Sequence, residues 1–364
     1  MKTGRIGLML ILIFVSLAIV RCGEDDTPIT LVSVKGKVTF TNAAGTAANA
    51  GGAIVYLENV TAATSVSTVA NVTGDYTFEN LEAGSYNLTA EYNTDNKNAS
   101  GRFNGLTFKS FAPEPVVVAA MDVVKDLTLT SAGQTGLEVV AANYAWNPAA
   151  TPNPTYSNTG ALVYDAVHST LNFEFPYRNW PSDFTGSFQQ LSKVLINFDP
   201  ANLGTSTFDI EVDVASINTR APGGRDNRLT VVDNPLFSPA SMFTELGCTM
   251  GTFGITANAT PTDASPQLMT TNTKRYARFV STSVVKLGDG YVAKGNVTFL
   301  GITKATDIWF KGVPPWTDLS NNRRYSGFEG RFIMNAKADY GVISSNITDA
   351  PVKIQFGIVL YKQL

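Results

Sequence analysis

The most constraining feature of the sequence is a regular two-residue alternation between Thr207 and Val214. Apolar side chains would share one face of this segment, namely Phe208, Ile210, Val212 and Val214. The acidic side chains Asp209, Glu211 and Asp213 would share the opposite face. A period of two predicts a β-strand with one buried face and one wet face. Beyond Thr219 the chain enters a Pro-Gly-Gly loop that carries Arg225 and Asp226. The apolar face must lie against either a packed core or a space kept for a ligand.

The composition extends the β prediction to the whole chain. Its 364 residues leave room for two domains, and 44% hydrophobic against 16% charged residues indicates globular material. The 30 Gly and 17 Pro lie between short runs of Val, Ile, Thr, Phe and Tyr. This pattern favours strands over helices. We therefore predict an all-β fold, with a small β-sandwich followed by an antiparallel β-barrel of about eight strands.

The N-terminus predicts a signal peptide over residues 1–21. Lys2 and Arg5 precede an almost unbroken hydrophobic run, which is shorter than the ~20 residues of a membrane span. The run leads to Cys22, and this arrangement resembles the lipid-attachment site of bacterial lipoproteins. The resemblance implies lipid attachment at Cys22, membrane anchoring through the acylated N-terminus, and a tether over residues 22–30. The expected location is the cell envelope, as an outer membrane lipoprotein that is periplasmic or surface-exposed.

Charge and cysteine content exclude several classes of protein. Cleavage before Cys22 would remove three of the 27 basic residues and none of the 30 acidic ones, which leaves a net charge of −6. An acidic chain without basic clusters argues against a nucleic-acid partner. With Cys22 acylated, Cys248 is the only thiol left. No intramolecular disulfide is then available, so the β core must supply the stability.

Residues 31–130 predict the sandwich. Turn residues such as Gly74-Asp75 separate short strand-like runs, at 34–38, 53–57, 74–81 and 83–90. Their arrangement resembles the carboxypeptidase regulatory-like, transthyretin-like family of β-sandwiches, which implies a spacer or adhesive role. Residues 131–155 contain three closely spaced prolines and are interpreted as a linker.

Residues 156–364 predict the barrel. Alternating strand candidates continue from Leu171 to the C-terminus, and Gly288-Asp289-Gly290 between two of them is a hairpin signal. Closure of such a sheet removes its edges and leaves room for one small ligand.

Motifs along this second part resemble the YceI-like family, whose domains are lipocalin-like and bind polyisoprenoids. The similar segments follow one another in the family's order, at 168–173, 184–188, 214–219 with Arg225-Asp226, 277–282, 295–303 and 339–341. The resemblance implies a lipocalin-like barrel with a long apolar pocket. The chain departs from the family at Glu245 to Arg275, a long Thr-rich loop that could cover the barrel mouth.

The ligand-binding wall is predicted from side chains that would point into the barrel, with Arg225 at the polar head of the ligand. These residues are Phe173, Phe175, Phe188, Phe198, Phe208, Ile210, Val212, Phe279, Tyr291, Phe299 and Arg225. In a fully packed barrel the same apolar side chains would simply be core. A surface structural or adhesive protein with a solidly packed barrel is therefore the alternative interpretation.

The sequence offers little catalytic chemistry. His168 is the only histidine, and Asp165 and Ser169 nearby invite a hydrolase interpretation, but no nucleophile-elbow sequence is present. A zinc site needs several Cys or His ligands, which this chain lacks. We predict no catalytic residues, no metal site and no cofactor. The predicted function is non-enzymatic binding or transport of an amphiphilic lipid, such as an isoprenoid, a quinone or a fatty acyl chain.

Overall fold

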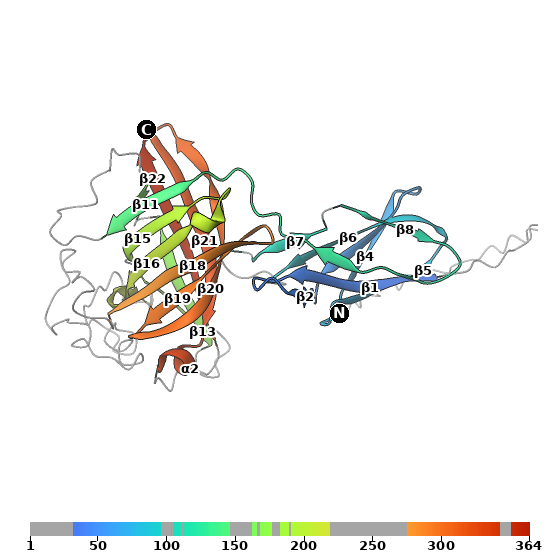
Figure 1. The fold of residues 1–364 in the computed structure, drawn as a ribbon, viewed down its shortest axis with the longest axis horizontal. Helices are drawn as coiled ribbons and strands as arrows, with labels where there is room; N and C mark the ends of the chain where they lie inside the picture. Colours follow the sequence, from blue (N-terminus) through green and yellow to red (C-terminus); the bar gives the residue numbers. More distant parts are fainter. Residues whose placement is uncertain are drawn as a thin grey trace, which may run out of the picture.

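The computed structural model describes residues 32–95, 103, 105–110, 112–145, 162–165, 168–176, 183–188, 191–218, 275–342 and 351–364. They fold almost entirely into β-strands, which confirms the predicted all-β class (Figure 1). Two small sheets lie in the N-terminal part, and one large curled sheet contains most of the remainder. Cys22, Arg225, Asp226 and Cys248 lie outside the described residues.

The two small sheets form a module that we call the sandwich. The first sheet is built around β1 (Val32–Thr41), which pairs with β2 (Ala47–Asn49), β5 (Asp75–Leu81), β9 (Val123–Val124) and β10 (Leu127–Leu129). The second runs in the order β4-β3-β6-β7, with β8 also on β6. Its strands are β3 (Ile54–Asn59), β4 (Thr64–Val69), β6 (Gly84–Asn93), β7 (Thr107–Lys109) and β8 (Glu114–Val118).

Alternate residues of the two sheets meet in one apolar core. Val34 and Val38 from the first sheet and Val55 and Leu88 from the second are all fully buried. The turn into β5 needs glycine at position 74, because its φ is +84° and a Cβ there would lie 2.6 Å from the Val38 carbonyl oxygen. This close approach allows the Val38 amide to donate to the Gly74 carbonyl.

The large sheet, which we call the barrel, contains twelve strands among the described residues. Its order is β11-β15-β16-β18-β19-β20-β21-β22-β13-β14-β17, with β12 on β22. The first six strands in chain order are β11 (Val140–Ala145), β12 (Val163–Tyr164), β13 (Thr170–Pro176), β14 (Asp183–Phe188), β15 (Leu191–Phe198) and β16 (Thr207–Asp213). The others are β17 (Ile217–Asn218), β18 (Tyr276–Leu287), β19 (Gly290–Phe299), β20 (Ile302–Asp318), β21 (Arg323–Met334) and β22 (Val352–Gln363).

Two connections bring the ends of this strand order together. β17 follows β16 after the short 3₁₀ turn Val214–Ser216, yet it pairs with β14 at the far end of the order. At the other end, Ala142 of β11 bridges to Leu162, which leads directly into β12 on β22. The sheet therefore curls around its own core, with the helix α2 (Ala336–Tyr340) at one end (Figure 1).

Two segments are more ordered than the sequence suggests. β11 lies within residues 131–155, the predicted linker, and pairs with β15 along its whole length. The end of β20 continues beyond Pro314 and Pro315 as far as Asp318, although proline disfavours a strand interior. The register of β20 shifts between Val313 and Trp316, where Pro314 and Pro315 lack the amides that a regular ladder needs.

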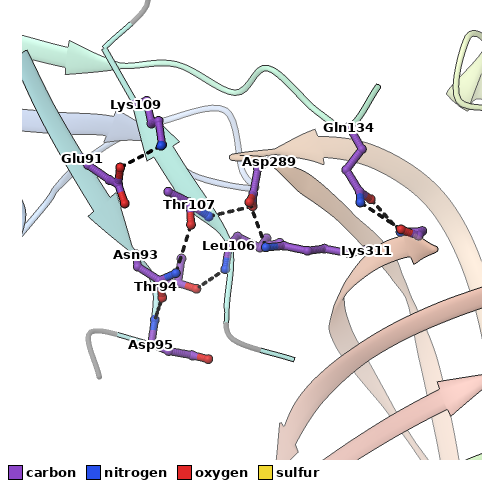
Figure 2. A network of polar contacts seen from close by, with 11 residues as sticks. Glu91, Asn93, Thr94, Asp95, Leu106, Thr107, Lys109, Gln134, Asp289 and Lys311 are labelled. Carbon is purple, nitrogen blue, oxygen red and sulfur yellow. Dashed lines mark hydrogen bonds and ion pairs between the residues drawn. The ribbon is translucent and has the colours of Figure 1, made fainter. Parts of the chain in front are cut away.

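The tip of the β18–β19 hairpin joins the sandwich to the barrel. Leu287 and Val292 belong to the apolar core of the sandwich. Between them, the Asp289 carboxylate accepts hydrogen bonds from the Thr107 amide and from Lys311 Nζ, both at 2.8 Å (Figure 2). The two modules thus share both apolar and polar contacts.

Candidate functional site

A cavity of about 160 Å³ occupies the half of the barrel next to α2. On β22 its lining runs from Val352 to Ile358, and on β21 it runs from Met334 back to Phe328. Met334 pairs with Val352, and Phe328 pairs with Ile358. The cavity therefore follows the parts of both strands that are nearest to α2, and its lining is almost entirely apolar.

Eight of the eleven residues that the sequence predicts for the ligand wall line this cavity. They are Phe173, Phe175, Phe188, Phe208, Ile210, Val212, Phe279 and Phe299. Each comes from a strand that alternates, so that every second side chain points inward. Arg225 lies outside the described residues, and its role at a ligand head stays a prediction.

The other two predicted residues belong to a packed cluster deeper in the barrel, which we call the aromatic floor. It consists of Phe198, Phe208, Tyr291, Phe310 and Phe328. Phe198 meets Tyr291 edge-on with ring centroids 5.1 Å apart, and it meets Phe328 at 5.3 Å. Phe198 and Tyr291 are 1% and 0% exposed. Edge-to-face packing of this kind leaves no space between the rings, so the floor closes the cavity at this end.

A short segment after the sandwich lies across the same end of the barrel. The Gln134 side chain donates to the Gly312 carbonyl at 2.9 Å and accepts from the Gly312 amide at 2.6 Å. Leu137 packs against the barrel core, and Glu138 pairs with Arg324 at 2.9 Å. The end of the barrel beyond the floor is thus covered by residues 134–138.

The sequence prediction missed the contribution of the last two strands. Phe332, Met334, Ile354, Phe356 and Ile358 all line the cavity. The alternation of Val352, Ile354, Phe356 and Ile358 is a signal that could have identified them. The small residue Ala293 of β19 also lines the cavity and is 2% exposed. Small side chains in a barrel wall leave space, which a search for bulky residues overlooks.

The outer face of β16 carries ion pairs. Both Asp209 carboxylate oxygens accept from Arg278 at 2.7 Å, and one also accepts from Lys193 at 2.6 Å. Burial disfavours ionised Asp209, but these hydrogen bonds outweigh it and hold its pKa below the ordinary value. Arg278 also borders the cavity, but its guanidinium is held by Asp209.

Two further acids on this face are buried, although the sequence predicts that the face is wet. Asp213 is 2% exposed and accepts two hydrogen bonds from Arg275, at 2.9 and 2.7 Å. Glu211 is 7% exposed and accepts from Ser192 at 2.7 Å. Burial raises the pKa of Glu211, although the Ser192 hydrogen bond opposes the shift.

Comparison with known families now places the chain. A family model described as the YceI-like domain matches residues 162–360, which is more than half of the chain. The chain belongs to the YceI-like family. The cavity, its floor and α2 all lie within the matched residues, and the fold is that of a lipocalin-like binding domain.

Solved structures similar to the chain come from three bacteria. BcnA of Burkholderia cenocepacia is 18% identical, with a TM-score of 0.34, and the match covers 54% of this chain and 98% of that one. The YCEI protein of Campylobacter jejuni is 15% identical, with a TM-score of 0.31, over 52% of this chain and 91% of that one. A Pseudomonas aeruginosa protein described as a candidate carbohydrate binder is 15% identical, with a TM-score of 0.22, over 28% and 89%. Among curated proteins, none matches.

His168 of the YceI-like domain forms a local contact at the start of β13. Its Nδ1 lies 2.8 Å from Asp165 Oδ2, and the imidazole is largely exposed. The neighbouring Ser169 Oγ accepts from the Val359 amide of β22 at 2.9 Å. The Ser169 side chain therefore holds the chain just before β13 against β22, whereas the His168 contact stays within its own segment. The absence of catalysis stays a prediction.

Among the described residues, no three His, Cys, Asp or Glu side chains gather as a metal ion would need. No helix in the same part of the chain combines the length and apolar character needed to cross a bilayer.

Proposed function

We propose that the YceI-like domain binds the apolar tail of an amphiphile, such as an isoprenoid, a quinone or a fatty acyl chain, without chemical turnover. The observation that carries the proposal is the cavity of about 160 Å³ within the apolar core of the barrel. Burial of each CH₂ group contributes about 0.8 kcal/mol, so an apolar tail needs no charged contact to be held. The alternative of a solidly packed barrel does not account for this cavity.

The size of the cavity limits how much of the tail it encloses. A cavity of about 150 Å³ in a protein core is known to hold one benzene ring, which has six carbon atoms. The cavity here is of similar volume, so it would enclose a segment of about six carbons. A longer tail would leave its remaining carbons and its polar head outside the described lining.

The direction of entry follows from the closed end. The aromatic floor blocks the cavity on one side, and Leu137 covers the barrel beyond it. The tail would therefore enter from the α2 side, where Met334, Ala336 and Val352 form the rim. Its terminal carbons would lie against Phe208, Phe310 and Phe328.

Native mass spectrometry of protein purified without detergent tests the proposal. We expect a bound species with the mass of a lipid, released on unfolding and absent from the unfolded chain. Protein that is ligand-free as isolated and also fails to bind added polyprenyl lipids would contradict the proposal.

We also propose that Cys22 is acylated and anchors the protein to the outer membrane, with the sandwich as a spacer of the carboxypeptidase regulatory-like kind. The hydrophobic run before Cys22 supports this proposal. Cys22→Ser should release the protein from the membrane fraction. Persistent membrane association of this variant would indicate an uncleaved N-terminal anchor instead.

A further inference from the structure

β4 is an edge strand that lacks the usual protection against pairing with another chain. It pairs with β3 on one side, and among the described strands none pairs with its other side. The chain carries no charged residue between Glu58 and Asp75, and β4 itself reads Thr-Ser-Val-Ser-Thr-Val without proline. Edge strands in soluble proteins are normally short, charged, interrupted by proline or covered, because free amides and carbonyls attract other strands.

The other edges of the sandwich show this protection. β5 carries Asp75 and Glu79, and β8 carries Glu114 and Pro115. β7 is only three residues long and ends at Lys109. β4 is therefore the one long uncharged edge among the described strands of the sandwich.

The sequence of β4 is self-complementary. Residues 64–68 read Thr-Ser-Val-Ser-Thr, which is the same in both directions. In an antiparallel pair of two such strands centred on Val66, every residue lies opposite one of its own kind. Thr64 faces Thr68 of the other copy, Ser65 faces Ser67, and Val66 faces itself. Threonine and serine pairs of this kind hydrogen-bond across strands, and a two-fold axis through one residue closes the assembly at two copies.

The solvent exposure of Val66 supports the same centre of pairing. Val66 pairs with Leu57 of β3 and shares its core-facing side of the sheet, where Leu57 is 1% exposed. Val66 nevertheless remains 51% exposed. A valine on the inner face of a sandwich normally lies beneath the opposite sheet, and here that cover is missing at the centre of the palindrome.

We propose that β4 pairs antiparallel with β4 of a second copy of this chain, in a register centred on Val66. The two sheets then join into one continuous sheet, and the two Val66 side chains cover each other on its inner face. The partner is another copy because the palindrome and the uncovered valine share one centre, which a strand of unrelated sequence would not match. The interface lies on the sandwich, so it leaves the barrel cavity free and does not depend on a ligand.

Cysteine cross-linking tests the register in the full chain, with Cys22 and Cys248 replaced by serine. Val66→Cys should give a disulfide-linked dimer under mild oxidation, because the residue faces itself at a Cα separation that a disulfide can span. Ser65→Cys and Ser67→Cys should each give little dimer alone but should cross-link when the two variants are mixed. Val69→Cys is the matched control, because it is 65% exposed but would face Ala63 rather than itself.

A charge substitution tests the association without cross-linking. Val66→Lys places two ammonium groups at the axis, and the mass measured by light scattering should fall from two chains to one. Val72→Lys is the control, since Val72 is 90% exposed and lies beyond the strand, and its mass should remain that of two chains. A monomeric unsubstituted chain, equal cross-linking at positions 66 and 69, a dimer that survives Val66→Lys, or cross-links only to another protein would each overturn the proposal.

Discussion

Asp213 and Arg275 form a deeply buried ion pair in the barrel, joined by two hydrogen bonds. The side chains are 4% and 8% exposed, and the Val214 amide also donates to the Arg275 carbonyl at 2.8 Å. Burial disfavours the charged guanidinium, but the hydrogen bonds and charge of Asp213 outweigh it and raise the pKa of Arg275. Removing one partner of a buried pair is far more costly than removing an exposed one.

Arg275→Met should therefore lower the free energy of unfolding by about 3–5 kcal/mol in urea denaturation. Lys193→Met is the matched control, because Lys193 is more exposed and Asp209 keeps its two hydrogen bonds from Arg278. The control should cost about 1 kcal/mol or less. Equal decreases in the free energy of unfolding in both variants would contradict a larger contribution of the Asp213–Arg275 pair.

The raised pKa of Glu211 should make the stability of the folded chain depend on pH in the opposite sense to that given by a carboxylate in an ion pair. Its pKa is raised by burial, so the folded chain holds this proton at pH values where the unfolded chain has released it. Stability must then fall as pH rises above the ordinary pKa of glutamate. Glu211→Gln keeps an acceptor for Ser192 but has no proton to lose in this range. The melting temperature of the variant, relative to that of the unsubstituted chain, should therefore increase as the pH is raised from 4 to 7. The exposed Glu79→Gln should show no such gain, and a gain that shrinks with rising pH would contradict the assignment.

At the scale of elements, the β18–β19 hairpin carries the contact between sandwich and barrel. Gly288 at its tip has φ of +56°, and a Cβ there would lie 2.7 Å from the Thr107 carbonyl oxygen and 3.2 Å from the Phe108 ring. The Gly288 amide also donates to Ser131 Oγ at 2.9 Å. A side chain at this position must push the two modules apart.

Gly288→Ala should destabilise the protein more than Gly136→Ala does. Both glycines have positive φ, so alanine carries a similar backbone strain at each, but nothing lies within 4 Å of a Cβ at position 136. The difference in unfolding free energy should be about 1–3 kcal/mol, as for overpacking of a core. Hydrogen exchange at the Thr107 amide, which donates to Asp289, should accelerate only in the first variant. Equal exchange rates of the Thr107 amide in the two variants would contradict the contact of Gly288 with the sandwich.

The elements differ in how far the sequence could predict them. The alternation of β16 and the Gly288-Asp289 turn are local patterns, and the structure contains both the strand and the turn, although Glu211 and Asp213 on the predicted wet face are buried. The hairpin's docking on the sandwich depends on Thr107, which is 182 residues distant from Asp289, and no local pattern records such a contact. β11 is likewise difficult to recognise as a strand, because its pairing with β15 is long-range and half of its residues are alanine.

At the scale of the whole molecule, sandwich and barrel meet through a second buried contact. Arg331 of β21 pairs with Asp95, just beyond β6, and its guanidinium lies over the rings of Phe103 and Trp309. Burial lowers the pKa of Arg331. Together with the β18–β19 hairpin, this contact holds the sandwich against the outer wall of the barrel.

The two halves of the barrel also explain why the sequence left its function open. Inward-facing Phe residues predict a core and a ligand wall equally well, because both need the same alternation. The structure contains both: Phe198 packs in the floor, whereas Phe299 lines the cavity. The cavity has space beside the small side chain of Ala293. Strand register decides which inward-facing side chains lie around that space, and no single sequence motif specifies the register.

The most direct test of tail binding is the affinity for amphiphiles that share one head group and differ only in tail length. Each CH₂ enclosed by the cavity should tighten binding by about fourfold, from about 0.8 kcal/mol of burial, over a segment of about six carbons. Longer tails should then gain much less per carbon. Ala293→Phe should fill the cavity and abolish this dependence, whereas Phe198→Leu in the floor should lower stability but retain it. An affinity that is independent of tail length, or unchanged by Ala293→Phe, would contradict binding of the tail in this cavity.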